Sequence, residues 1–131
     1  MTTRFIARFA VAALAVLSLS AHAGKVSDED FGFDTTEDLY MVCSTPTTAP
    51  EYQVAHFACR AFIEATVQYH DAVSDRERLK RLICYPKQAT IGDGRRAFLR
   101  WAEANASSEQ RMEELPVVGL VRALSDSYPC R

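Results

Sequence analysis

Apolar residues recur at spacings of three and four along most of the chain, which places them on one face of an α-helix. The longest such run predicts a central helix over residues 51–72. Shorter runs predict a helix that begins at Thr35 or Thr36, a helix from about residue 87 to 105, and a last helix over residues 116–128. No run shows the sustained alternation of a strand, so we predict an all-α fold. On the central helix, the residues expected to face inward are Tyr52, Ala55, Cys59, Phe62, Ile63, Thr66, Tyr69 and Val73.

Polar residues and prolines near the ends of these runs indicate where the helices begin. Thr90 can cap the helix after it, because a threonine hydroxyl accepts a hydrogen bond from a free N–H group of the first turn. Pro116 suits the first turn of the last helix, where its missing N–H costs nothing. The sequence SDRE at residues 74–77 has the form of a capping box and predicts a further short helix that ends before Pro86. We therefore expect a small bundle of about four to five helices. On the last helix, the residues expected to face inward are Val117, Leu120, Val121, Leu124 and Tyr128.

The first 23 residues have the three parts of a secretory signal peptide. Two arginines precede an apolar run over residues 9–19, and the sequence AHA at 21–23 matches the small-x-small pattern before a cleavage site. The apolar run has 11 residues, whereas a membrane-spanning helix needs about 20. We therefore expect cleavage after Ala23, export to the periplasm, and a mature protein that begins near Gly24 and is not held in a membrane.

The length of the mature chain predicts one small domain. Residues 24–36 are acidic and contain glycine, so we expect a flexible N-terminal segment ahead of a helical domain over residues 37–131. The signal peptide holds two of the 15 Lys and Arg residues and none of the 17 acidic residues, which leaves a net charge of −4. This acidic excess argues against nucleic acid as a partner, because nucleic-acid-binding domains carry a basic stripe.

The four cysteines of the mature chain are Cys43, Cys59, Cys84 and Cys130. In an oxidising compartment, an even cysteine count in a short chain predicts disulfides. The helices over residues 87–105 and 116–128 should form an antiparallel hairpin that brings Cys130 back to Cys84, so we pair these two. The remaining pair is Cys43 with Cys59, and the seven loop residues 44–50 can span roughly 23 Å, which is enough for this bridge.

The sequence gives little support for catalysis or for a bound metal or cofactor. A zinc site needs several close Cys or His ligands, and the chain offers only His56 and Cys59 as a pair at helical spacing. A cysteine nucleophile needs an unpaired thiol, and the even count leaves none. His70 lies next to Asp71, where we expect a capping or surface role. A small hydrolase would require a titratable cluster that the sequence does not show.

Four segments of the chain together resemble one known family. They are DLYMVC at 38–43, FACRAFIEATVQYHDA at 57–72, CYPKQATIGDGRRAFLRWAEAN at 84–105 and LPVVGLVRALSDSYPC at 115–130. In this order they resemble the Rap/Tai family of immunity proteins, which protect type VI-secreting bacteria from peptidoglycan amidase effectors. The resemblance covers about residues 37–130. The family typically carries two glycines one helical turn apart after the second cysteine. This chain has Ala61 and Ala65 there, which should still let a neighbouring helix approach closely.

The resemblance implies a binding function without catalysis. Family members are usually dimers that insert a loop or helix end into the substrate groove of the amidase. We therefore expect a homodimer that binds an exported peptidoglycan amidase effector and occludes its active-site groove. The alternative is a small periplasmic stress or chaperone-like helical protein, which acid-triggered exposure of apolar surface would identify.

Residues 105–114 are the best candidate for an inserted loop. The sequence NASSEQRMEE is polar, lacks core periodicity and joins two helices anchored by a predicted disulfide. An ordinary solvated connector is the competing interpretation. Met112 is expected either to contact the partner or to pack beneath the loop. The residues expected to contact the partner are Asn105, Ser107, Ser108, Glu109, Gln110, Arg111 and Met112.

Overall fold

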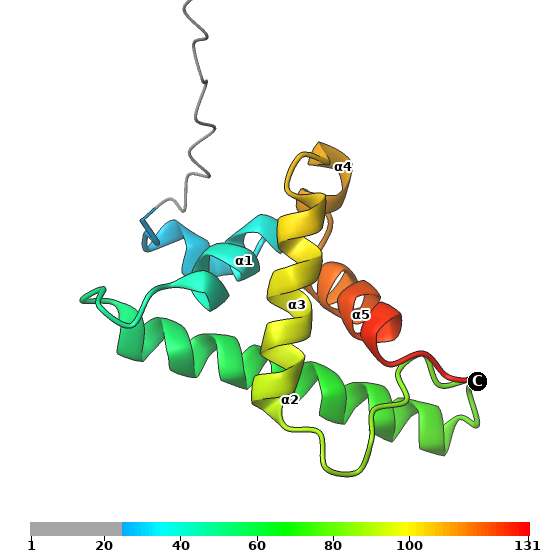
Figure 1. The fold of residues 1–131 in the computed structure, drawn as a ribbon. Helices are drawn as coiled ribbons and strands as arrows, with labels where there is room; N and C mark the ends of the chain where they lie inside the picture. The colour runs from blue at the N-terminus through cyan, green and yellow to red at the C-terminus, as the bar shows by residue number, and fades with distance from the viewer. Residues whose placement is uncertain (1–24) are drawn as a thin grey trace, which may run out of the picture.

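The structure of the protein is a computed structural model that describes residues 25–131. In this part of the chain there are five α-helices, one short 3-10 helix and no strand, which confirms the predicted all-α class (Figure 1). None of these helices is both long and apolar enough to cross a membrane. The predicted signal peptide lies outside the described residues. In chain order the elements are η1 (Glu29–Gly32), α1 (Thr36–Ser44), α2 (Tyr52–Arg76), α3 (Ile91–Asn105), α4 (Glu109–Met112) and α5 (Pro116–Ser127).

The helices α1 and α3 begin at threonines that the sequence indicated. The Asp38 N–H donates to the Thr35 hydroxyl, and the Asp38 carboxylate accepts from the Thr35 N–H, which makes a capping box. Thr90 and Asp93 form the same arrangement at the start of α3. Pro116 occupies the first turn of α5. Because each cap pairs N–H groups that the helix itself leaves unpaired, these boundaries follow from the local sequence.

The short helix predicted after residue 74 does not form. Ser74 is buried inside α2, which continues to Arg76, and residues 77–90 form an irregular connection. The Leu79 N–H donates to the Ser74 carbonyl at 3.1 Å, and Arg78 has a φ of 50°. A left-handed residue followed by this hydrogen bond is the Schellman arrangement that closes the end of a helix. The prediction was wrong because SDRE lies at a helix end and not at a helix start.

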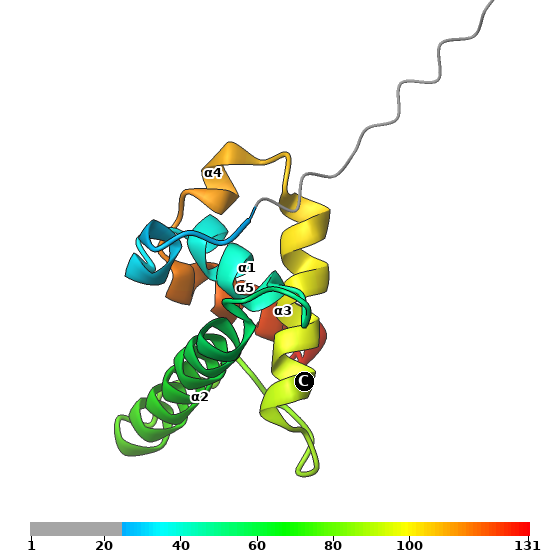
Figure 2. The same cartoon turned by 90° about the vertical axis from the view of Figure 1, so that its left-hand side faces the viewer.

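The core lies where α1, α2, α3 and α5 meet (Figures 1 and 2). α3 crosses α2, and after α4 the chain packs back against α3 as α5. The predicted inward face of α2 is correct at Ala55, Cys59 and Ile63 but wrong at Tyr69, which is 73% exposed. Val117 on α5 is 40% exposed and is also not a core residue. The largest fully buried side chains are Phe98, Leu39, Ile63, Ile83 and Leu120.

Residues 25–36 pack against the helices. Val26 is buried, and the Phe33 ring lies 5.1 Å from the Phe62 ring of α2, measured between centroids. η1 lies beside α1, and the flexibility expected of residues 24–36 stays a prediction. The boundary of the helical domain at residue 37 stays a prediction.

Two disulfides use all four cysteines in the predicted pairing, Cys43 with Cys59 and Cys84 with Cys130. The first joins the end of α1 to α2. The second joins the connection after α2 to the C-terminus, where the Cys84 N–H also donates to the Tyr128 carbonyl at 2.9 Å. In the loop-entropy model, bridges that span 16 and 46 residues contribute about 3 and about 4 kcal/mol. Such amounts are a large share of the stability of a domain of this size.

Candidate functional site

Residues 106–115, which connect α3 to α5 and contain α4, project from one end of the molecule and are called the α4 loop here. Figures 1 and 2 show the loop at the end of α3 that lies away from α2. The loop therefore offers a surface that the rest of the helical core does not cover. Its exposed side chains include Ser107, Glu109, Gln110, Glu113 and Leu115.

The start and the middle of the α4 loop are fixed by contacts with the core. Met112 is 5% exposed and packs with the buried residues under the loop. The Arg111 guanidinium lies 5.9 Å from the centroid of the Trp101 ring, and the Asn105 side chain donates to the Trp101 carbonyl at 2.7 Å. Met112 therefore packs beneath the loop and covers the end of the core, and its contact with a partner stays a prediction.

The C-terminal base of the α4 loop is tied to α1. The Thr36 N–H donates to the Glu114 carbonyl at 2.8 Å, and the Thr36 hydroxyl lies 2.9 Å from that oxygen and 3.2 Å from the Leu115 carbonyl. The Arg122 guanidinium donates to both oxygens of the Glu114 carboxylate, at 2.8 and 3.1 Å, and this contact raises the pKa of Arg122. The α4 loop is thus held at both ends, so its shape exists before any partner binds.

A second exposed feature is an apolar groove of about 260 Å³ between the C-terminal half of α2, the connection after it and α5. We call it the α2–α5 groove. Four large apolar side chains on its rim are 40 to 73% exposed. Clusters of exposed apolar side chains mark contact surfaces more often than isolated ones do. The four rim residues are Tyr69, Leu79, Leu82 and Val117.

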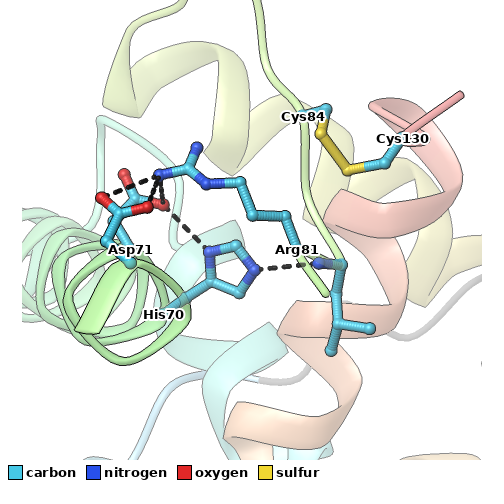
Figure 3. The surroundings of a disulfide bond; sticks show 7 residues. His70, Asp71, Arg81, Cys84 and Cys130 are labelled. Atoms are coloured by element: carbon cyan, nitrogen blue, oxygen red, sulfur yellow. Dashed lines mark hydrogen bonds and ion pairs between the residues drawn. A yellow bond between two sulfur atoms is a disulfide. The ribbon is translucent and has the colours of Figure 1, made fainter. Parts of the chain in front are cut away.

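A network of titratable side chains lies under one wall of this groove (Figure 3). His70 Nδ1 is 3.0 Å from Asp71 Oδ1, and His70 Nε2 accepts a hydrogen bond from the Leu82 N–H at 3.1 Å. The Tyr85 hydroxyl donates to Asp71, and Arg81 Nη2 is 3.4 Å from the same carboxylate. Burial raises the pKa of Asp71, but the hydrogen bonds from Tyr85 and His70 and the charge of Arg81 together hold it below its usual value. Burial and the Asp71 carboxylate raise the pKa of Tyr85 to about 12.

The surface or capping role expected for His70 is wrong, because its side chain is only 8% exposed and both ring nitrogens have partners. His70 and Asp71 are arranged as in a catalytic dyad. In such a dyad Nε2 faces the nucleophile, but here it faces the Leu82 N–H. This pair therefore has no hydroxyl or thiol to activate. Among residues 25–131, no group of three His, Cys, Asp or Glu side chains is placed to hold a metal ion.

The outer face of α2 carries a stripe of small and apolar side chains, called the α2 stripe here. Val54 and Phe57 are 63 and 65% exposed, and Ala61 and Ala65 are exposed on the same face. Their spacings of three, four and four residues place them in one line along the helix. We expected a neighbouring helix to approach the two alanines, but no element of residues 25–131 covers them.

Comparison with known proteins identifies the family. No curated protein and no solved structure matches the chain. The model of the family described as Rap1a immunity proteins matches residues 35–130, from the cap of α1 to the second cysteine of the last disulfide. That range holds all five α-helices, both disulfides and the α4 loop, and it agrees with the resemblance found in the sequence. The chain belongs to the Rap1a immunity protein family.

Proposed function

We propose that this protein is a periplasmic immunity protein that binds a type VI peptidoglycan amidase effector and occludes its active-site groove. Family membership over residues 35–130 is the observation that carries the proposal. The signal-like sequence of residues 1–23 and the two disulfides support export, because disulfides persist in oxidising compartments.

The α4 loop supports occlusion as the mode of inhibition. Glu109 and Gln110 are exposed at its outer side, while Met112 and the Thr36 contacts hold its base. A loop already held in its bound shape avoids an ordering cost of about 0.5–1.5 kcal/mol for each side chain that would otherwise be immobilised. The proposed contact residues are therefore the exposed ones of the predicted set, Ser107, Glu109 and Gln110, with the exposed Leu115 beside them.

The test is inhibition of a peptidoglycan amidase encoded beside this gene by the oxidised protein, residues 24–131. The parent protein should bind the amidase and stop peptidoglycan cleavage at a one-to-one ratio. The double variant Glu109→Ala/Gln110→Ala should bind at least about tenfold more weakly, a loss of about 1.4 kcal/mol. Failure of the parent protein to bind or inhibit would contradict the immunity function.

The matched control is Glu77→Ala/Gln88→Ala, which removes the same two residue types from the exposed connection between α2 and α3. Surface substitutions of this kind change stability by less than about 0.5 kcal/mol, so both double variants should fold. The control should inhibit as the parent does. If both double variants inhibit fully, the protein still binds the amidase but not through the α4 loop.

We also propose that the α2 stripe joins two copies of the protein into a homodimer. If two α2 helices pack antiparallel about Ala61, Phe57 of each copy lies opposite the small Ala65 of the other. The same pairing brings Arg60 toward Glu64 of the second copy, and opposite charges across an interface favour one orientation. Light scattering should give twice the chain mass for the parent and a single chain mass for Ala61→Glu. A parent protein that stays monomeric at high micromolar concentration would contradict this pairing.

A second candidate function is a periplasmic stress or chaperone-like protein. The exposed leucines of the α2–α5 groove support it, since chaperones hold clients through apolar surface. Suppression of aggregation of an unfolded client protein at acid pH, without any effect on an amidase, would favour this function over immunity.

A further inference from the structure

One wall of the α2–α5 groove, residues 77–82, is attached to α2 mainly through polar contacts. Its two leucines, Leu79 and Leu82, are 56 and 55% exposed, so little apolar burial holds the wall in place. Arg78 has a φ of 50°, a left-handed conformation that is costly for residues other than glycine. The wall ends at Ile83, which is fully buried and fixes the chain beyond it. The position of the wall therefore depends on its hydrogen bonds and ion pairs.

Two of these polar contacts meet at neighbouring residues of α2. The Leu82 N–H donates to His70 Nε2 at 3.1 Å. Arg81 Nη2 lies 3.4 Å from Asp71 Oδ1 and 3.3 Å from Asp75 Oδ1. Figure 3 shows the His70 imidazole beside Asp71, toward which Arg81 also extends, and the Leu82 N–H contacts the other ring nitrogen. We call the Leu82 hydrogen bond the first tether of the wall and the Arg81 ion pairs the second. The His70 side chain takes part in the first tether and also contacts Asp71, which is a partner of Arg81 in the second.

The Leu82 hydrogen bond requires a neutral imidazole. A ring nitrogen that accepts an N–H carries no proton, so the single ring proton of His70 is on Nδ1 and is donated to Asp71. Protonation places an N–H on Nε2 directly against the Leu82 N–H. Two donors cannot share a hydrogen bond, so protonation of His70 removes this tether.

The charged surroundings weaken the second tether at the same time. A protonated His70 places a second cation beside the carboxylate that Arg81 uses, so the two cations compete for Asp71. The groove-lining residues of α5, Val117 and Val121, add no charge. Of the titratable groups around the imidazole, Asp71 contacts the ring, and Tyr85 and Arg81 contact Asp71. Asp75 contacts Arg81, and Lys80 lines the same groove as His70.

We propose that His70 is a pH-sensitive latch: when neutral it holds residues 80–82 against α2, and when protonated it releases them and widens the α2–α5 groove, while the Leu79 hydrogen bond to Ser74 keeps residues 77–79 in place. An imidazole gains a proton on acidification, so the release occurs in acid. Release uncovers the apolar floor of the groove at Val73 and Val121. The apolar surface available for binding is then larger in acid than at neutral pH. This device does not depend on the proposed immunity function. It would equally provide the acid-exposed apolar surface expected of the chaperone-like alternative, so dye binding alone does not distinguish the two functions, whereas amidase inhibition and client binding do.

The test is an NMR titration of the oxidised protein, residues 24–131, from pH 8 to pH 5. The Leu82 amide resonance should move with the same midpoint as the His70 ring carbons. Its hydrogen exchange, corrected for the intrinsic pH dependence, should become faster by about tenfold or more, as expected for loss of one hydrogen bond. Fluorescence of an apolar dye such as ANS should rise over the same pH range.

Two single variants distinguish the effect of His70 protonation from the effects of other groups that titrate over the same pH range. His70→Gln removes the titrating ring and should abolish the pH dependence of the Leu82 amide and of the dye signal. His56→Gln, in the N-terminal half of α2 and away from the groove, should leave both unchanged. A Leu82 amide in the parent protein that does not respond to the ionisation of His70 would overturn the proposal, and so would the same response in His70→Gln.

Discussion

Replacement of Gly119 by alanine tests the close approach of α5 to α1. An added Cβ would lie 2.4 Å from both Cγ2 and Oγ1 of Thr36 and 3.0 Å from its Cβ. Thr36 cannot turn away without losing its hydroxyl contacts with the α4 loop at 2.9 and 3.2 Å. Overpacking costs about 1–3 kcal/mol, and an orphaned buried hydrogen-bonding group costs a similar amount. Alanine regains only about 1 kcal/mol of helix propensity over glycine.

The overlap with Thr36 is severe, so the cost should lie in the upper part of this range. We expect Gly119→Ala to lose a net amount of about 1–2 kcal/mol, which lowers Tm by about 5–15 °C in a domain of this size. The assay is urea and thermal unfolding of the oxidised protein, residues 24–131.

The control for this variant is Gly92→Ala, in the first turn of α3. A Cβ there would meet Thr90 Oγ1 at 3.5 Å and Arg96 Nη1 at 3.6 Å, which are ordinary contacts. We expect Gly92→Ala to be neutral or to stabilise by up to about 1 kcal/mol. If Gly119→Ala is as stable as Gly92→Ala, α5 does not approach Thr36 of α1 as closely as described.

Three further predictions concern single residues. Cys43→Ser or Cys59→Ser should remove one disulfide from the intact mass and lower the free energy of unfolding by about 3 kcal/mol; unchanged stability would exclude a structural role for this bridge. Arg78→Gly should stabilise by up to about 1 kcal/mol in urea unfolding, because glycine adopts positive φ without strain, and a loss of stability would contradict the Schellman end of α2. Tyr85 should ionise near pH 12 in an ultraviolet titration. Since an unfolded tyrosine ionises near pH 10, stability should fall as pH rises from about 10 to 12. Tyr85→Phe should show a smaller fall, which does not vanish because burial also raises the pKa of Tyr40.

The helix starts and the disulfide pairing could be predicted because their signals are local or topological. Thr35 and Thr90 each precede an aspartate by three residues, which is enough for a capping box. The end of α2 was misread because its left-handed position holds Arg78, where a glycine would have indicated a helix end. A Ser-x-x-Glu pattern alone does not distinguish the two ends.

The candidate site could be predicted only in part. Residues 105–114 are polar and aperiodic, which indicated a loop, but spacing alone could not decide that Met112 is buried. Tyr69 and Val117 have the spacing of core residues yet lie at the surface. Periodicity identifies a helix face but not the length over which a neighbour covers it. The latch had no sequence signal, because the partner of His70 Nε2 is a backbone N–H twelve residues away.

The most direct measurement on the proposed mode of inhibition is the hydrogen-exchange footprint of the complex with the neighbouring amidase. Backbone amides of residues 106–115 of this protein should exchange more slowly in the complex than in the free protein. The amidase should be protected around its own active-site groove. Protection of a different surface, such as the α2–α5 groove, with unchanged exchange in residues 106–115, would contradict occlusion by the α4 loop.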